Sequence, residues 1–172
     1  MSKALVVIDV QNDYFAGGQL PLWNAEATLD RVEAAVQQAH ARGIPVVLVQ
    51  HLADPAVGIA PFFNRGTAGA EVHPRLRAAA GSAPVVVKSF ADGFVSTTLE
   101  DTLDRLGATE LLICGMMTQN CVTHTAISKS AAKYDVAILP DACTTVSELI
   151  HKIALHPVAT RLRLVPSSEA LA

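Results

Sequence analysis

Short apolar runs alternate along the chain with longer segments in which apolar residues recur every three or four positions. The runs have the length of buried strands, and the longer segments have the spacing of amphipathic helices. Gly43 and Gly107 end two of the helical segments. The pattern predicts strands at residues 4–10, 45–50, 84–87, 111–114, 136–139 and 162–165, and helices at 25–42, 72–80, 97–106, 121–133 and 146–156.

Strands and helices that alternate in this way imply right-handed crossovers and a parallel sheet with helices on both faces. We therefore predict an α/β fold of three αβα layers, with a Rossmann-like, six-stranded parallel sheet in the middle. The 172 residues contain no linker, repeat or low-complexity stretch, so we expect one domain over residues 1–172. In such folds ligands bind beyond the carboxyl ends of the strands.

The amino-acid composition limits the kinds of partner that this chain is expected to bind. Hydrophobic residues make up 51% of the chain, charged residues make up 17%, and the net charge is −3. No basic block suits nucleic acid, and no apolar run reaches membrane-spanning length. Three cysteines without metal-ligand spacing, in a chain with no recognisable signal peptide, favour a reducing, cytoplasmic setting. We expect a small-molecule substrate, with no nucleic-acid or membrane partner.

Three chemically useful side chains lie at predicted strand ends: Asp9, Lys88 and Cys121. Each has a structural explanation on its own, because Asp9 can cap a loop, Lys88 can extend to solvent and Cys121 can pack as a small core residue. Together, a thiol, a carboxylate and an ammonium are the groups that amide hydrolysis through a thioester requires. A helix end and the ammonium would lower the pKa of the thiol, and the carboxylate would carry the proton.

The segments around these residues carry a family resemblance. DVQNDY at 9–14, Lys88, CGMMTQNCV at 114–122 and DAC at 141–143 resemble, in this order, the signatures of the isochorismatase-like cysteine hydrolases. That superfamily includes nicotinamidases, carbamoylsarcosine amidohydrolases and isochorismatases. The resemblance covers essentially the whole chain.

The resemblance implies the six-stranded parallel sheet and a catalytic triad of Asp9, Lys88 and Cys121. It also implies a cis peptide bond between Met116 and Met117. That bond would direct the N–H groups of Met117 and Cys121 at the carbonyl oxygen of the substrate, as an oxyanion hole.

One loop departs from the nicotinamidase pattern, in which an Asp-x-His pair and a further His hold a metal. The comparable loop reads HLADPA at 51–56 and has Ala56 where that pattern has histidine. One His and one Asp are too few ligands for a metal. We therefore predict no metal and no other cofactor, and we do not expect nicotinamidase activity.

These observations predict a metal-free hydrolase that cleaves an amide-type C–N bond through a thioester on Cys121. Family members that cleave the vinyl ether of isochorismate often lack the cysteine, so its presence favours C–N cleavage. The alternative is an isochorismatase-type ether hydrolase in which Asp9 is the general acid. A binding or sensor domain is a third reading, but three such groups in one pocket are costly unless they are used.

Further pocket candidates are polar or aromatic residues near the same sheet edge: Gln11, Tyr14, His51, Phe63, Phe94 and Thr118. Aromatic residues in loops suit the walls of a pocket, although an oligomer interface explains them equally well. We expect a homodimer or homotetramer. The loop 51–70 is long enough to act as a lid.

Three other residues are weaker candidates for the chemistry. His124 follows Cys121 by three positions and could form a dyad with it, but that turn of the helix should face the core. Cys143 could face the pocket, whereas Cys114 lies within an apolar strand and should be inert.

Overall fold

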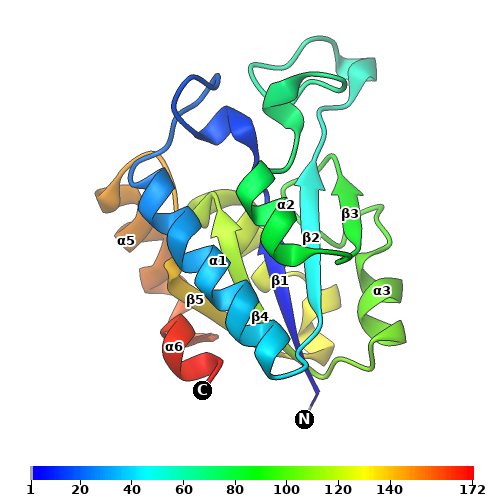
Figure 1. The fold of residues 1–172 in the computed structure, drawn as a ribbon, viewed down its shortest axis with the longest axis vertical. Coiled ribbons are helices and arrows are strands. Elements are labelled where there is room, and N and C mark those ends of the chain that lie inside the picture. The colour runs from blue at the N-terminus through cyan, green and yellow to red at the C-terminus, as the bar shows by residue number, and fades with distance from the viewer. Residues whose placement is uncertain (1) are drawn as a thin grey trace.

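Six parallel strands form the sheet at the centre of the molecule, as Figure 1 shows. The computed structural model describes residues 2–172. The strands are β1 (Lys3–Ile8), β2 (Val46–His51), β3 (Val85–Lys88), β4 (Glu110–Met116), β5 (Asp135–Thr144) and β6 (Arg163–Leu164). Their order is β3-β2-β1-β4-β5-β6, so the winding reverses between β1 and β4, where α/β folds bind ligands.

Helices cover both faces of this sheet and complete the predicted three layers (Figure 1). They are α1 (Ala25–Ala41), α2 (Pro74–Ala80), α3 (Leu99–Arg105), α4 (Thr123–Ala126), α5 (Glu148–Val158) and α6 (Ser167–Ala170). The helices α1, α2 and α6 lie on one face, and α3, α4 and α5 lie on the other. The α/β fold predicted from the pattern is therefore confirmed. No helix within residues 2–172 is long and apolar enough to cross a membrane.

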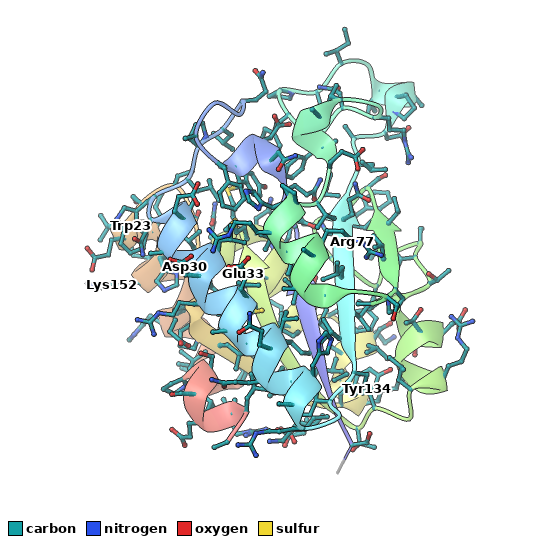
Figure 2. All side chains as sticks on the ribbon, viewed as in Figure 1. Trp23, Asp30, Glu33, Arg77, Tyr134 and Lys152 are labelled. Carbon is teal, nitrogen blue, oxygen red and sulfur yellow. The ribbon has the colours of Figure 1, made fainter. Side chains whose placement is uncertain are left out.

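The sheet is buried on both faces, which explains why its central strands read as continuous apolar runs. Every residue of β4 is buried, and so is β1 after its first residue. Helix α1 packs an apolar stripe on the sheet and turns Asp30 and Glu33 outward, as labelled in Figure 2. Arg75 of α2 donates hydrogen bonds to both carboxylates, at 2.7 Å in the case of Asp30, and so joins the two helices.

The chain departs from the predicted elements mainly on the second face. The helix expected at 121–133 is broken into a π-helical turn (Thr118–Val122), the four-residue α4 and a 3-10 turn (Ser130–Lys133). The helix predicted at 146–156 instead continues to Val158, with Pro157 inside α5. The helix α6 was not predicted.

Strand β5 is also longer than predicted, because it continues through a bulge. Ile113 of β4 pairs with Ile138, whereas Gly115 pairs with Cys143. Asp141 lies in this bulge and accepts hydrogen bonds from the backbone N–H and the hydroxyl of Ser167, at 2.8 and 2.6 Å. Its carboxylate thus fixes the C-terminal segment.

Gly115 allows β4 to approach β1 closely just before the switch point. Its φ is +115°, and a Cβ atom placed there would lie 2.0 Å from the carbonyl oxygen of Ile8. We expect Gly115→Ala to lower the free energy of unfolding by about 3 kcal/mol or more. Gly43→Ala is the matched control, because Gly43 has a φ of +67° but open space around it, so it should cost only about 1 kcal/mol. Urea denaturation measures both, and equal losses would contradict the close-approach explanation.

Candidate active site

Lys88 is the centre of the site, and its ammonium has three partners. Nζ lies 2.7 Å from Asp9 Oδ2, 2.9 Å from His51 Nδ1 and 3.1 Å from Cys121 Sγ. An ammonium has three N–H donors, so these contacts use all of them. The register of the sheet explains the arrangement, because Lys88 and His51 are paired residues at the ends of β3 and β2. The structure thus brings the three predicted triad residues together with His51.

The ion pair between Asp9 and Lys88 is removed from water. The side chains of both residues are 0% exposed. Apart from this ion pair, neither oxygen of Asp9 has a hydrogen-bond partner among residues 2–172. A carboxylate oxygen that is buried and unpartnered is costly in a purely structural role, but it is available to accept a proton.

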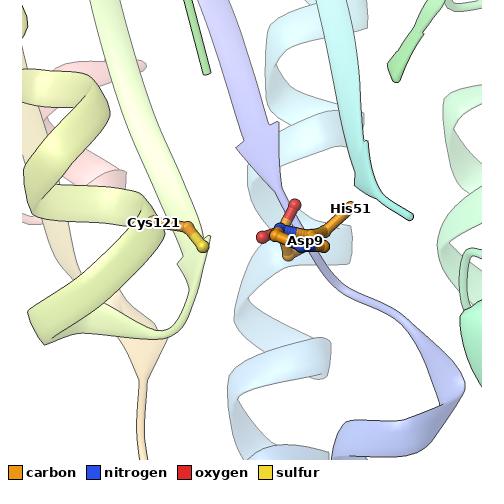
Figure 3. Close-up of side chains that lie close together, drawn as sticks. All are labelled: Asp9, His51 and Cys121. Carbon is orange, nitrogen blue, oxygen red and sulfur yellow. The ribbon is translucent and has the colours of Figure 1, made fainter. Parts of the chain in front are cut away.

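Cys121 lies on the π-helical turn that follows β4. The turn is closed by the carbonyl of Met117, which accepts hydrogen bonds from the N–H groups of Asn120 and Val122 at 3.0 and 3.3 Å. The peptide bond between Met116 and Met117 is cis, at the position that the family resemblance implies. In Figure 3 the sulfur of Cys121 points toward Asp9, which lies at the end of β1.

The predicted lowering of the Cys121 pKa is wrong. Burial raises the pKa of the thiol, the nearby Asp9 carboxylate raises it further, and Lys88 only partly opposes both. The regular helix expected to begin at Cys121 is also absent, since α4 has four residues. The resting site therefore holds a neutral thiol beside an ion pair of Asp9 and Lys88.

This protonation state predicts slow alkylation of Cys121 near neutral pH. Only the thiolate reacts with iodoacetamide, so a raised thiol pKa in the folded protein means that labelling increases only well above pH 9. In urea the same cysteine should react faster at pH 8.5, as an ordinary thiol does. Mass spectrometry of labelled peptides measures both rates. Rapid labelling of the folded protein at pH 7 would contradict the assignment.

The other members of the cluster have defined charges. Burial opposes the charged form of Lys88, but Asp9 and Cys121 outweigh burial, and the net effect raises the pKa of the ammonium. Burial and then Lys88 lower the pKa of His51, and Asp9 opposes them. His51 is therefore a neutral imidazole whose Nδ1 accepts from Lys88, which leaves the proton on Nε2.

Gln11, a predicted pocket residue, is used to position the strand ends. Its side-chain amide donates to the carbonyl oxygens of His51 and Ala70, at 2.8 and 2.7 Å. Its carbonyl oxygen accepts from the N–H of His51 at 2.8 Å. Gln11 thus holds His51 in place and has no free amide group for a substrate.

Thr118 and Phe94, two further predicted pocket residues, are also used elsewhere. The hydroxyl of Thr118 is buried, donates to the carbonyl of Thr144 at 3.1 Å and lies 2.8 Å from Nδ1 of His151. The ring of Phe94 stacks on Tyr134, with centroids 6.3 Å apart, and Tyr134 precedes β5 at the opposite end of the sheet. Neither side chain is free to line the pocket.

Tyr14 and Phe63 do lie beside the cluster. Their ring centroids are 4.6 Å apart, and the ring of Phe63 lies 5.9 Å from that of His51. Phe62 completes this aromatic group at 5.8 Å from Tyr14. Burial, followed by the charge of Asp9, raises the pKa of Tyr14, so its hydroxyl keeps its proton. The roles of Tyr14, His51 and Phe63 toward a substrate stay predictions.

The weaker candidates take structural positions. His124 is exposed and its Nδ1 lies 2.8 Å from the carbonyl of Asn120. Cys114 and Cys143 are buried in strands, and burial is the main cause that raises the pKa of both thiols, that of Cys143 to about 12. Sequence reasoning underrated His51, although its place at a strand end beside Lys88 is a usable signal.

The loop 51–70, which is long enough for a lid or a substrate wall, is held at Phe63 by a buried carboxylate. Asp13 accepts hydrogen bonds from the N–H groups of Phe63 at 2.8 Å and Gln19 at 3.2 Å. A Cβ atom on Gly69 would lie 2.0 Å from the same carboxylate, so this end of the loop packs directly on Asp13.

Asp9, His51 and Cys121 each offer a metal-ligand atom, and these atoms lie within 4.8 Å of one another. The ammonium of Lys88, however, lies 2.7–3.1 Å from an atom of each residue. A divalent cation among these ligands would have to displace a buried positive charge. The donor set therefore suits the ammonium better than a metal ion.

Residues 3–170 match the Isochorismatase domain family. The chain belongs to the isochorismatase family. The uncharacterized isochorismatase family protein YddQ of Bacillus subtilis is 35% identical over 147 residues, which are 86% of this chain and 80% of that protein. A streptothricin hydrolase of Streptomyces noursei is 31% identical, over 98% of this chain and 64% of that protein.

Solved structures agree with this family membership. A putative isochorismatase hydrolase from Oleispira antarctica has a TM-score of 0.89 and 29% identity, covering 99% of this chain and 96% of that one. The nicotinamidase PncA from Bacillus subtilis has a TM-score of 0.84 and 26% identity, covering 96% and 99%. The protein is therefore a hydrolase of the isochorismatase family, with the α/β fold of the cysteine hydrolases.

Proposed function

We propose that this isochorismatase-family protein hydrolyses an amide-type C–N bond of a small molecule through a thioester on Cys121. The observation that carries the proposal is the contact of one buried ammonium with both the thiol sulfur and a carboxylate, at 3.1 and 2.7 Å. The raised pKa of Cys121 means that the attacking group is a neutral thiol. The adjacent carboxylate can accept the thiol proton as the sulfur attacks, so a preformed thiolate is not required.

In the first half of the reaction, Sγ of Cys121 attacks the amide carbon and its proton passes to a carboxylate oxygen of Asp9. The N–H groups of Met117 and Cys121 would donate hydrogen bonds to the developing oxyanion. The intermediate then collapses, the C–N bond breaks, and Asp9 returns the proton to the departing amine. Lys88 stays protonated and stabilises the carboxylate and any charge that develops on the sulfur.

In the second half, water attacks the thioester carbon and gives a proton to Asp9. The C–S bond breaks, the acid leaves, and the proton returns to the sulfur of Cys121. Asp9 therefore acts as base and acid in turn within each half, and the enzyme returns to its starting state.

Two of the similar proteins support the C–N assignment, since one is named a streptothricin hydrolase and one a nicotinamidase. This chain is less than 35% identical to both, so they support the type of bond and not the substrate. The vinyl-ether reaction is the alternative, with Asp9 as the acid and Cys121 as a bystander.

Intact-mass spectrometry after mixing with an activated amide, the 4-nitroanilide of methoxyacetic acid, tests the proposal. We expect a methoxyacetyl adduct that maps to Cys121 and turns over, because the thioester is an intermediate. The variant Cys121→Ala should give no adduct and no turnover. Turnover of a vinyl ether by Cys121→Ala, without any adduct in the unmodified protein, would contradict the proposal and support the ether reaction.

A further inference from the structure

Two hydrogen-bond donors beside the thiol have no partner in the protein. Within residues 2–172, neither Oη of Tyr14 nor Nε2 of His51 makes a hydrogen bond, although Nδ1 of His51 does. In the same residues, the two oxygens of Asp9 are the only fully buried side-chain polar atoms without a hydrogen-bond partner, apart from the ion pair with Lys88. Both atoms therefore keep some exposed surface, although Tyr14 as a whole residue is only 1% exposed.

Both groups carry a proton that they can donate. Lys88 donates to Nδ1 of His51, so the neutral ring carries its proton on Nε2. Asp9, Lys88, Cys121 and Tyr14 are the titratable groups around this ring, and the pKa of His51 is lowered by burial and by Lys88. Burial and then the Asp9 carboxylate raise the pKa of Tyr14, so the phenol stays protonated.

His51 lies beside the thiol, where an acyl group bound to Cys121 would extend, and Tyr14 lies in the adjoining aromatic group. An oxygen of Asp9, a ring nitrogen of His51 and the sulfur of Cys121 lie within 4.8 Å of one another. Tyr14 joins them through Phe63, whose ring contacts both Tyr14 and His51. Figure 3 shows His51 beside Asp9, on the side toward which the sulfur points.

We propose that the site selects amides whose acyl group carries a second hydrogen-bond acceptor near the scissile carbonyl, with Tyr14 and His51 as its donors. The inference rests on the proposed function for the bond that is cleaved. Asp9 is the other hydrogen-bond acceptor nearby, but the proposed reaction uses it to accept the proton of Cys121. It is therefore not the acceptor for these two donors. An acyl group with only apolar atoms would displace water from both donors and leave them unpaired, which a polar site disfavours strongly.

Binding of a matched pair of amides tests this inference without any chemistry. 2-Methoxyacetamide and butanamide have the same number of heavy atoms and differ by an ether oxygen in place of a methylene. We expect NMR titration of the Cys121→Ala protein to show tighter binding of the methoxy compound. Tyr14→Phe and His51→Asn, each added to that protein, should reduce the preference about two- to tenfold.

The two His51 variants separate its two nitrogens. In His51→Asn the shorter amide can still accept from Lys88 near the position of Nδ1 but has no group at Nε2. In His51→Gln an N–H returns near Nε2, so the preference for the ether should recover. Nitrogen-15 NMR of the unmodified protein should also show His51 as the neutral Nε2–H tautomer at pH 7.

Equal binding of the two amides, no binding of either, or an Nδ1–H tautomer would overturn the inference. Because binding to Cys121→Ala needs no thioester, the two proposals fail separately. Absence of an acyl adduct would refute the proposed function and leave the binding result standing. An adduct without any acceptor preference would refute the inference alone.

Discussion

Asp9→Asn should lower kcat by about 10²–10⁴-fold while the thiol becomes easier to ionise. The amide keeps the size of the carboxylate but cannot take the proton of the attacking sulfur or water. Asp9 is the leading charged cause, after burial, of the raised pKa of Cys121, so its removal should lower that pKa. The variant should therefore alkylate faster than the unmodified protein at pH 8.5 and yet turn over far more slowly.

Asp13→Asn is the matched control for the thiol. Asp13 is also a buried carboxylate near the end of β1, but it contacts the backbone of Phe63 and Gln19, and it is not among the groups that shift the pKa of Cys121. It should leave the alkylation profile unchanged. An Asp9→Asn protein that alkylates no faster than Asp13→Asn would contradict the electrostatic account. Asp9→Asn leaves the Lys88 ammonium buried without its anion, which could destabilise the protein. Circular dichroism should therefore confirm the fold of both variants.

The positions of the triad could be predicted because the sheet determines them. Strands buried on both faces read as unbroken apolar runs, so a polar residue at their ends is visible in the sequence. Asp9, Lys88 and Cys121 come from β1, β3 and the turn after β4, whose carboxyl ends meet at one edge. Parallel topology brings these strand ends to one edge, and the turn after β4 then carries Cys121 to Lys88.

The electrostatics could not be predicted, because they depend on burial and distance. Composition and position suggested a thiolate at Cys121, whereas the structure buries the sulfur and places Asp9 close enough to raise its pKa. The helix expected to stabilise the charge ends after a few residues. Side-chain contacts likewise determine which polar residues are free to line the pocket. Gln11 and Thr118 are polar, but both already donate hydrogen bonds to backbone carbonyls.

Lys88→Met should move the thiol in the opposite direction to Asp9→Asn. The ammonium lowers the pKa of Cys121, so its loss should raise that pKa further, and each pKa unit corresponds to about 1.4 kcal/mol. Turnover should fall as well, because Asp9 loses its buried counter-ion and the sulfur loses its hydrogen-bond donor.

Alkylation by iodoacetamide across pH 8–11 measures the shift, with Cys121 identified by peptide mapping. Methionine has nearly the length of lysine, so the apolar stem is kept while the charge is removed. If Asp9→Asn and Lys88→Met moved the thiol pKa in the same direction, the two residues would be a structural ion pair. Opposite shifts, with turnover lost in both, are the result that assigns the proton to Asp9 and the charge stabilisation to Lys88.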